Sequence, residues 1–262
     1  MDKKRRVALI TGSAAGLGKM TALALADQGC DIVINYVNSE QEALKLQQII
    51  THKGVRCLTI KADITDSDQV NHMLEMVNRE LGNIDILVNN AGPFIRERRL
   101  FAEYSIAEIR YLINGNLLGV MELDYLVLPM MRLNKWGRVI HFGFGHAAEA
   151  RGWPHRAVYA AAKVGLVSFT KSLAVEEAGN GITVNMIGPG DIHGANKEKH
   201  IHEVEHDFDA ESPRGRPGTG EDIARVIAFL CLEKSDFITG NIMDISGGLD
   251  PIRTMGASQH LH

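Results

Sequence analysis

The segment Arg6–Gly18 reads RVALITGSAAGLG. A short apolar and β-branched run, Arg6–Thr11, leads into glycines spaced G-x-x-x-G-x-G, and a helical pattern follows at once with Met20, Leu23, Ala24 and Ala26. Glycines at a strand-to-helix turn let the backbone approach a pyrophosphate closely, and the helix N-terminus then offers free N–H groups. The segment therefore predicts a strand, a phosphate-binding turn and a helix, in that order.

The same alternation of strand and helix continues along the whole chain. Short apolar runs predict strands at Arg6–Thr11, Asp31–Tyr36, Val55–Ala62, Ile84–Asn89, Arg138–Phe144, Thr183–Gly188 and Asn241–Ile245. Between them lie amphipathic segments, such as the one that places on one helical face Val70, Met73, Leu74, Val77 and Leu81. We therefore predict an α/β fold, a single doubly wound Rossmann-type domain over residues 1–262, with a parallel sheet of about seven strands and helices on both faces.

This context decides between two interpretations of the glycine turn. The alternative is an ordinary tight turn that binds no ligand, because glycines are common at strand ends. The turn here opens the first strand–helix unit of an alternating chain, which favours a dinucleotide site. Its spacing differs from the G-x-G-x-x-G pattern of many such sites.

Helix starts and long helical segments carry two further signals. Capping boxes are predicted at Ser39-x-x-Glu42 and at Ser105-x-x-Glu108. The predicted helices at residues 105–133 and 158–178 hold more apolar residues than one sheet-facing stripe requires. Such surplus apolar surface is usually buried against a second subunit, so we expect a homo-oligomer.

Composition excludes several classes of protein. The chain has 262 residues, 45% of them hydrophobic, and 28 Lys and Arg against 32 Asp and Glu give a net charge of −4. This balance lacks the basic excess of a nucleic-acid-binding protein, so we expect no nucleic-acid partner. No secretory signal and no apolar run of the length that spans a bilayer is visible. The cysteines, Cys30, Cys57 and Cys231, have neither disulfide nor metal spacing, and we expect a cytoplasmic protein with reduced thiols and no membrane association.

One stretch breaks the alternation. Residues 191–220 are charged and rich in His, Pro and Gly, and a loop of this length is usually functional or mobile, so we expect a flap over a ligand site. Within it, the pentapeptide from His202 to His206 matches the H-E-x-x-H signature of zinc proteases. That signature needs a stable helix and a third ligand, whereas the surrounding sequence is typical of a solvated surface. We therefore predict no metal site.

Further motifs place the sequence in a family. Beyond Thr11–Gly18, the chain has Asn-Asn-Ala-Gly at 89–92, Tyr-Ala-Ala-Ala-Lys at 159–163, Pro-Gly at 189–190, Ile-Thr-Gly at 238–240 and Gly-Gly at 247–248. In order and spacing, the chain resembles the short-chain dehydrogenase/reductase family, and within it the 3-oxoacyl-[acyl-carrier-protein] reductase branch. The resemblance covers nearly the whole chain.

The resemblance implies a nicotinamide dinucleotide cofactor. The residues expected to bind it are Gly12, Ser13, Ala15, Gly16, Leu17, Gly18, Asn35, Tyr36, Asp63, Ile64, Asn90, Ala91, Gly92, Tyr159, Lys163, Pro189, Gly190 and Ile192. An acidic residue at the end of the second strand would favour NAD, but Asn35-Tyr36 stands there. We therefore favour NADP. NAD stays the alternative, because Ala15 occupies a position where related NADP enzymes often carry Arg, and only Lys19 is a candidate to replace that cation.

The expected catalytic residues are Tyr159, Lys163 and Asn116. Tyr159 and Lys163 are four residues apart on a predicted helix and thus share a face. An ammonium beside a phenol favours the phenolate, so we expect Lys163 to lower the pKa of Tyr159, which protonates the substrate oxygen. By resemblance Asn116 supports a proton relay. The alternative for Tyr159 and Lys163 is an ordinary pair on the surface, and the alternative for Asn116 is a helical residue that faces solvent.

One departure from the family pattern bears on activity. Family members carry a serine that holds the substrate carbonyl; counting from Gly137 this position is Phe144, and counting back from Tyr159 it is His146. Losing one such hydrogen bond lowers the rate on the order of 10²–10³-fold. Either His146 or His141 supplies the donor, or the enzyme is slow or has a changed substrate, or the fold binds cofactor without turnover.

The sequence thus predicts an NAD(P)H-dependent oxidoreductase that interconverts a ketone and a secondary alcohol. By resemblance the substrate is a 3-oxoacyl thioester or another small carbonyl compound, and the assembly is a dimer of dimers. The alternative is a weak or inactive dinucleotide-binding scaffold or sensor with the same fold.

Overall fold

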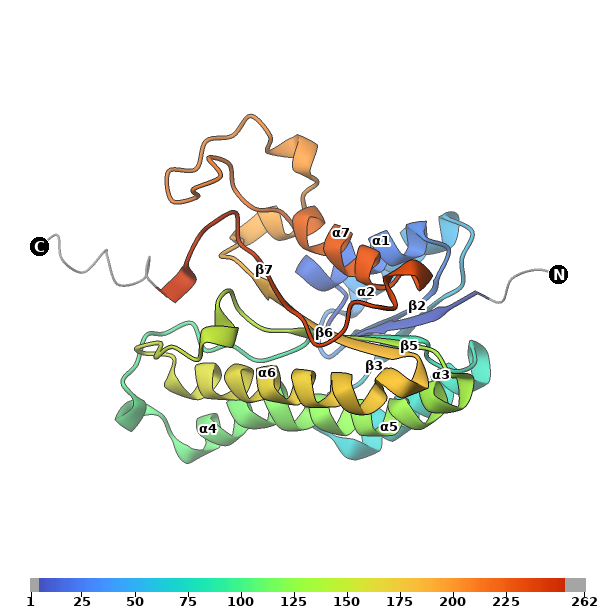
Figure 1. Ribbon diagram of the computed structural model, residues 1–262. Helices are drawn as coiled ribbons and strands as arrows, with labels where there is room; N and C mark the ends of the chain where they lie inside the picture. Colours follow the sequence, from blue (N-terminus) through green and yellow to red (C-terminus); the bar gives the residue numbers. More distant parts are fainter. Residues whose placement is uncertain (1–4, 253–262) are drawn as a thin grey trace, which may run out of the picture.

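A single parallel sheet forms the centre of the molecule. The computed structural model describes residues 5–252, and its seven strands lie in the order β3-β2-β1-β4-β5-β6-β7, with every neighbouring pair parallel (Figure 1). Their bounds are β1 Val7–Ile10, β2 Asp31–Tyr36, β3 Cys57–Lys61, β4 Ile86–Asn89, β5 Gly137–Phe142, β6 Ile182–Pro189 and β7 Ile242–Ile245.

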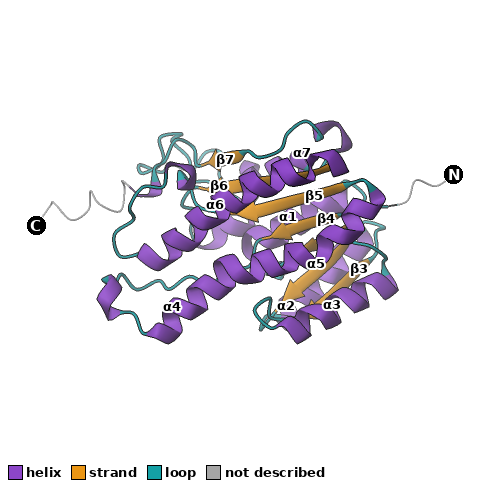
Figure 2. Ribbon diagram, turned by 60° about the horizontal axis from the view of Figure 1, so that its bottom comes forward, coloured by secondary structure: helices purple, strands orange, loops and turns teal. Residues whose placement is uncertain are grey.

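Helices cover both faces of the sheet. On one face lie α1 (Gly16–Asp27), α2 (Glu40–His52) and α7 (Gly220–Leu230); on the other lie α3 (Ser67–Glu80), α5 (Gly119–Asn134) and α6 (Ala157–Glu177) (Figure 1). The short helix α4 (Ile106–Ile113) packs beside α6, and Figure 2 shows α4, α5 and α6 together on the second face. This arrangement confirms the predicted doubly wound α/β fold.

The central strands show why the sheet could be predicted from the sequence. All residues of β1 and β2 are buried, as expected for strands with helices on both sides. Ala8 and Ile10 pack under α1, α2 and α7, whereas Val7 and Leu9 pack under α3, α5 and α6. The period of two in a strand thus divides one apolar run between two cores.

Two local predictions have different outcomes. Ser105 caps α4: its hydroxyl accepts from the Glu108 N–H at 3.2 Å, and the Glu108 carboxylate accepts from the Ser105 N–H at 2.9 Å. The capping box predicted at Ser39 is wrong, because the Ser39 side chain makes no capping hydrogen bond. Its backbone, at φ −96° and ψ 57°, lies outside the extended conformation from which an N-cap hydroxyl reaches the first turn.

The helical segment predicted at residues 105–133 is interrupted. Between α4 and α5, residues Asn114–Leu118 form one π-helical turn, η2. Such turns occur often at functional sites, because they redirect side chains within a continuous helix. Here the turn carries Asn116, one of the predicted catalytic residues.

Helix α6 is the long apolar helix of the second face. Among the residues described, the stretch Ala157–Asn180 is the one helix long and apolar enough to span a membrane, with a mean hydropathy of 1.3 over its most apolar window. Half of that window is buried inside the protein, where α6 packs on β6. The burial of a core helix accounts for its composition.

The topology gathers loops at one edge of the sheet. The chain runs outward through β1, β2 and β3, then returns to the centre and continues outward on the other side from β4. The loops after β1 and β4 therefore face each other across the point where the strand order reverses, which is where ligands bind in sheets of this type. The loops that follow β5 and β6 end at the same edge.

Candidate active site

The loop between β1 and α1 has a backbone that requires glycine. Gly12 and Gly16 have φ of +60° and +63°, in the left-handed region that favours glycine. A methyl group on Gly18 would lie 2.7 Å from Asn90 Nδ2 and 2.8 Å from the Gly12 carbonyl oxygen. Each glycine of the motif is therefore fixed by conformation or by close packing, as a phosphate-binding turn requires.

Asn90 fastens this loop to the end of β4. Its Nδ2 donates to the carbonyl oxygens of Thr11 at 2.8 Å and Gly12 at 3.1 Å. The Thr11 hydroxyl oxygen in turn accepts from the backbone N–H groups of Asn90 and Ala91, at 3.0 and 2.9 Å. The two motifs that the sequence separates by about eighty residues form one rigid unit.

Asn35 and Ser13 have their side chains turned into the protein. Asn35 Oδ1 accepts from the Gly12 N–H at 3.1 Å, and its Nδ2 donates to the Ala62 carbonyl at 2.8 Å. The Ser13 hydroxyl donates to the Ile10 carbonyl at 2.7 Å. Both residues, predicted to bind cofactor, thus use their side chains to hold the glycine loop.

The other predicted residues at the ends of β2 and β3 lie near this loop. Tyr36 is buried, and burial together with the neighbouring Glu40 carboxylate raises the pKa of its hydroxyl. The Asp63 carboxylate accepts from the backbone N–H of Thr65 at 2.9 Å and so closes its own turn. Ile64 is also buried. Tyr36 and Ile64 are thus buried, whereas Asp63 is partly exposed.

A cavity of about 290 Å³ joins the glycine loop to the Tyr-Lys pair. It is lined by Gly16, Leu17, Asn90, Gly92, Asn116, Phe142, Gly143, Tyr159, Lys163, Pro189 and Lys197. Eight of these are residues that the sequence predicted, taken from five separate motifs. Phe142, Gly143 and Lys197 were missed. The first two lie at the end of the predicted fifth strand and could have been inferred from that position, but Lys197 comes from the flap and had no signal.

Tyr159 and Lys163 lie one helical turn apart on α6. Lys163 Nζ is 5.9 Å from the centre of the Tyr159 ring. Burial raises the pKa of the Tyr159 phenol to about 12 and lowers the pKa of the Lys163 ammonium to about 8. The expected lowering of the phenol pKa by Lys163 is therefore wrong for this structure, because the loss of hydration on burial raises that pKa.

Asn116 has an acceptor oxygen without a hydrogen-bond partner, and this oxygen lies beside Gly92. Its Nδ2 donates to the carbonyl oxygens of Pro93 at 2.8 Å and Leu112 at 3.0 Å. Its Oδ1 is buried and has no hydrogen-bond partner among the described residues, and a methyl group on Gly92 would overlap it. The solvent-facing alternative is excluded, since Asn116 is fully buried. A buried acceptor left free beside Gly92 fits a ligand that brings its own hydroxyl.

Aromatic rings surround the phenol. The ring centre of Tyr159 lies 5.0 Å from that of Phe94, in an edge-to-face arrangement, and 6.2 Å from both Phe144 and Trp153. Phe144 is 5% exposed and packs on Trp153 at 4.7 Å. Of the two alternative positions for the family serine, Phe144 is therefore the one that lies against Tyr159.

Neither histidine near this position reaches the cavity. His146 Nδ1 is paired with the Glu149 carboxylate at 2.7 Å, and its backbone N–H donates to Asp244. His141 is fully buried, with its ring nitrogens 2.8 Å from Asp124 Oδ2 and 2.7 Å from the Thr170 hydroxyl. Both rings are engaged elsewhere, which leaves the place of the serine hydroxyl without a substitute from either.

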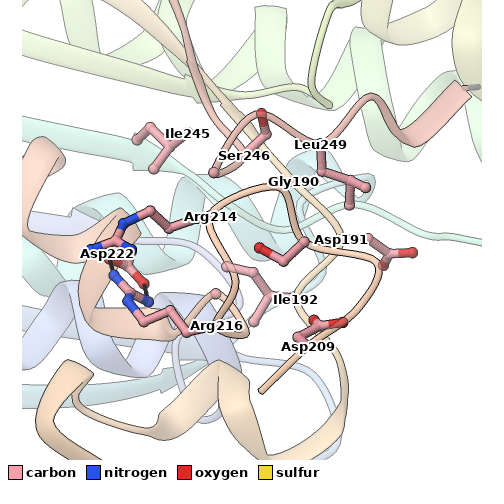
Figure 3. A pocket seen from close by; sticks show the side chains of 13 residues that line it. Gly190, Asp191, Ile192, Asp209, Arg214, Arg216, Asp222, Ile245, Ser246 and Leu249 are labelled. Atoms are coloured by element: carbon pink, nitrogen blue, oxygen red, sulfur yellow. Dashed lines mark hydrogen bonds and ion pairs between the residues drawn. The ribbon is translucent and has the colours of Figure 1, made fainter. Parts of the chain in front are cut away.

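The Pro189-Gly190 segment divides between two cavities. Pro189 lines the cavity of Tyr159, whereas Gly190 and Ile192 line a smaller one of about 80 Å³ between the flap and the end of β7 (Figure 3). There Arg216 faces Asp222 and donates two hydrogen bonds to it, at 2.9 and 2.7 Å (Figure 3). This ion pair fastens the end of the flap to α7.

The H-E-x-x-H segment does not form the helix that its motif requires. His202 lies in a single 3₁₀ turn, η6 (Ile201–Glu203), and His206 lies in the irregular chain beyond it, with an exposed ring. Within residues 5–252 there is no group of three or more His, Cys, Asp or Glu side chains that could hold a metal ion.

Known proteins share both the sequence pattern and the fold. Residues 12–250 match the family described as enoyl-(acyl carrier protein) reductase. YtkK of Bacillus subtilis, provisionally named an oxidoreductase, is 44% identical over 94% of this chain and 97% of its own. The 3-oxoacyl-[acyl-carrier-protein] reductase FabG of Staphylococcus aureus is 34% identical over 94% of this chain and 99% of its own.

Solved structures give the same result. A Bacillus thuringiensis protein provisionally described as a 3-oxoacyl-reductase superposes with a TM-score of 0.88 at 42% identity, over 95% of this chain and 99% of that one. Acetoin dehydrogenase YohF of Salmonella typhimurium superposes with a TM-score of 0.85 at 30% identity, over 94% and 96%. The chain therefore belongs to the short-chain dehydrogenase/reductase family of nicotinamide-dependent oxidoreductases.

Proposed function

We propose that this protein reduces a ketone to a secondary alcohol, or catalyses the reverse reaction, with NADPH. The observation that carries the proposal is the cavity that brings Tyr159 and Lys163 within one open space with Gly16, Asn90 and Asn116. Such a space holds a dinucleotide along the glycine loop and leaves its reactive end beside the phenol. NADPH supplies the hydride when bound.

Each side chain then has a defined task. The N–H groups at the start of α1 bind the pyrophosphate, and the Gly92 region and Pro189 line the channel. Lys163 binds the nicotinamide ribose. The Tyr159 phenol, whose pKa of about 12 keeps it protonated at neutral pH, donates its proton to the oxygen of the substrate as negative charge develops there. The free Oδ1 of Asn116 holds a hydroxyl or water that returns a proton to the phenol.

NADP is the proposed cofactor form. The end of β2 presents no Asp or Glu in the strand itself, since Asn35 and Tyr36 are its last residues. In the register of β2 and β3, Tyr36 pairs with Lys61, a basic residue at the end of β3. A cation here attracts a 2′-phosphate. We expect NADPH to bind at least tenfold more tightly than NADH.

The proposed substrates are 3-oxoacyl thioesters and other small ketones. FabG, which matches 94% of this chain, acts on the first class by its name, and YohF acts on acetoin by its name. Steady-state oxidation of NADPH with acetoacetyl-CoA and with diacetyl tests the proposal, and turnover of at least one is the expected result. Tight NADPH binding without turnover of any ketone would favour the alternative of a dinucleotide-binding scaffold.

Exchange of Phe144 for Ser tests whether the missing hydroxyl limits the rate. We expect kcat/KM of Phe144→Ser to exceed that of Phe144→Ala, its matched control, by about ten- to a hundredfold, because both open the same space but only Ser offers a donor. Both variants should lose about 3 kcal/mol of stability, since a buried ring is removed. Equal kcat/KM values for the two variants would show that position 144 does not face the carbonyl oxygen.

We also propose a homotetramer, a dimer of dimers, in the cytoplasm. The outer surfaces of α5 and α6 carry exposed apolar side chains, among them Tyr125 at 77%, Leu133 at 74% and Val175 at 80% exposure. The cysteines are free and buried, which suits a reducing compartment. A monomeric mass in light scattering would overturn the tetramer.

A further inference from the structure

The flap touches the glycine loop through an acidic side chain. The short helix η5 (Gly194–Glu198) lies across the start of α1. There Glu198 Oε1 accepts a hydrogen bond from the Gly16 N–H at 2.8 Å, and Glu198 Oε2 accepts one from Lys19 Nζ at 2.6 Å. A carboxylate thus has both of its oxygens bound to donors of the first turn of α1.

The pKa of Glu198 is consistent with an ionised group. Burial pushes the pKa of this carboxyl up, but the hydrogen bonds from Gly16 and Lys19 outweigh burial and hold the pKa below its ordinary value. At neutral pH the group at the helix N-terminus is therefore an anion. An anion in this position gains from the helix dipole as well as from the ammonium of Lys19.

The neighbouring residue covers the same part of the loop. A methyl group on Gly16 would lie 4.0 Å from Cβ and from Cδ of Lys197, so the stem of Lys197 packs over this glycine. Lys197 also lines the cavity that contains Tyr159 and Lys163. The face of Gly16 that a pyrophosphate must approach is therefore occupied by Lys197 and Glu198 together.

We propose that Glu198 is an intramolecular competitor of the cofactor's pyrophosphate, which holds the flap down until the dinucleotide displaces it; this inference rests on the proposed function. The displaced flap frees Gly16 N–H and Lys19 Nζ for phosphate oxygens. It also moves Lys197 away from the cavity of Tyr159.

The expected effect of Glu198 on the affinity for dinucleotide follows from the solvent exposure of the Lys19–Glu198 ion pair. The side chains of Lys19 and Glu198 are 28% and 37% exposed, so solvent weakens their attraction. A partly exposed ion pair with a helix-terminus contact shifts an equilibrium by about three- to tenfold. This is enough to lower the affinity for dinucleotide measurably and too little to prevent binding.

The experiment compares Glu198→Ala with Glu211→Ala, a control at an exposed flap residue whose side chain has no partner among the described residues. Binding of NADPH and of inorganic pyrophosphate is measured by titration calorimetry, and the thermal midpoint checks the fold. We expect Glu198→Ala to bind both probes about three- to tenfold more tightly than the wild type, with Glu211→Ala unchanged. Glu198→Gln, which keeps the acceptor but loses the charge, should lie between them.

The outcomes separate the competition by Glu198, which we call the latch, from the proposed function. If Glu198→Ala binds NADPH no more tightly than the wild type, the latch is wrong while the oxidoreductase proposal stands. If no form of the protein binds NADPH or NADH, the proposed function fails. A gain for inorganic pyrophosphate alone would then still show that Glu198 occupies an anion site on the glycine loop.

Discussion

Tyr159→Phe is expected to lower kcat for ketone reduction by about 10³-fold, with the dissociation constant of NADPH within about twofold of the wild-type value. The change removes one hydroxyl, and burial keeps the pKa of that hydroxyl near 12, so it is a full proton donor across the neutral range. Single-turnover kinetics at saturating NADPH measures the effect on the chemical step.

The surroundings of Tyr159 make this substitution a clean test. Its ring is held by Phe94, Phe144 and Trp153, and those contacts are made by ring carbon atoms that Phe retains. Tyr125→Phe, at an exposed position of α5, is the matched control and should leave kcat unchanged. Activity of Tyr159→Phe above a tenth of the wild-type value would mean that another group delivers the proton.

The fold was predictable because its signals are local. The bounds predicted for the second strand, Asp31–Tyr36, are those observed, since its central run Ile32–Ile34 is apolar and the whole strand is buried between two layers of helices. The signal of the glycine turn is also local, because a positive φ at Gly12 and Gly16 favours glycine at those two positions. Ser39 shows the limit: the residues of a capping box were present, but the backbone at Ser39 has a conformation in which its hydroxyl makes no capping hydrogen bond.

The site was predictable as a set of motifs and not as an electrostatic environment. The opposite pKa shifts of Tyr159 and Lys163 depend on how deeply α6 is buried, which the spacing of two residues does not contain. The inward turn of Asn35 depends on Ala62, a residue of another strand. The contact of Glu198 with Gly16 joins positions 182 residues apart through a segment without periodicity.

Lys163→Met is expected to raise the stability of the fold at pH 7 by about 3 kcal/mol while it removes ketone reduction. Lys163 is 3% exposed, and burial lowers the pKa of its ammonium from 10.5 to about 8. In the unfolded chain the ammonium keeps its ordinary pKa, so at neutral pH folding must bury a charge. Methionine has a similar length and carries no charge, so it removes this cost. Urea unfolding measures the difference.

The pH dependence identifies the cause. Between pH 8 and 10.5 the unfolded wild-type chain binds more protons at Lys163 than the folded chain does, so the cost is complete below pH 8 and is relieved as the pH rises through this window. The advantage of Lys163→Met over the wild type should therefore shrink from pH 8 to pH 10.5, and other titrating groups cancel in the comparison. Lys171→Met, at an exposed position of the same helix, should show no such trend. If the stability advantage of Lys163→Met stayed constant from pH 8 to pH 10.5, it would come from packing alone. The charge of Lys163 would then not be one that the site keeps at the expense of stability.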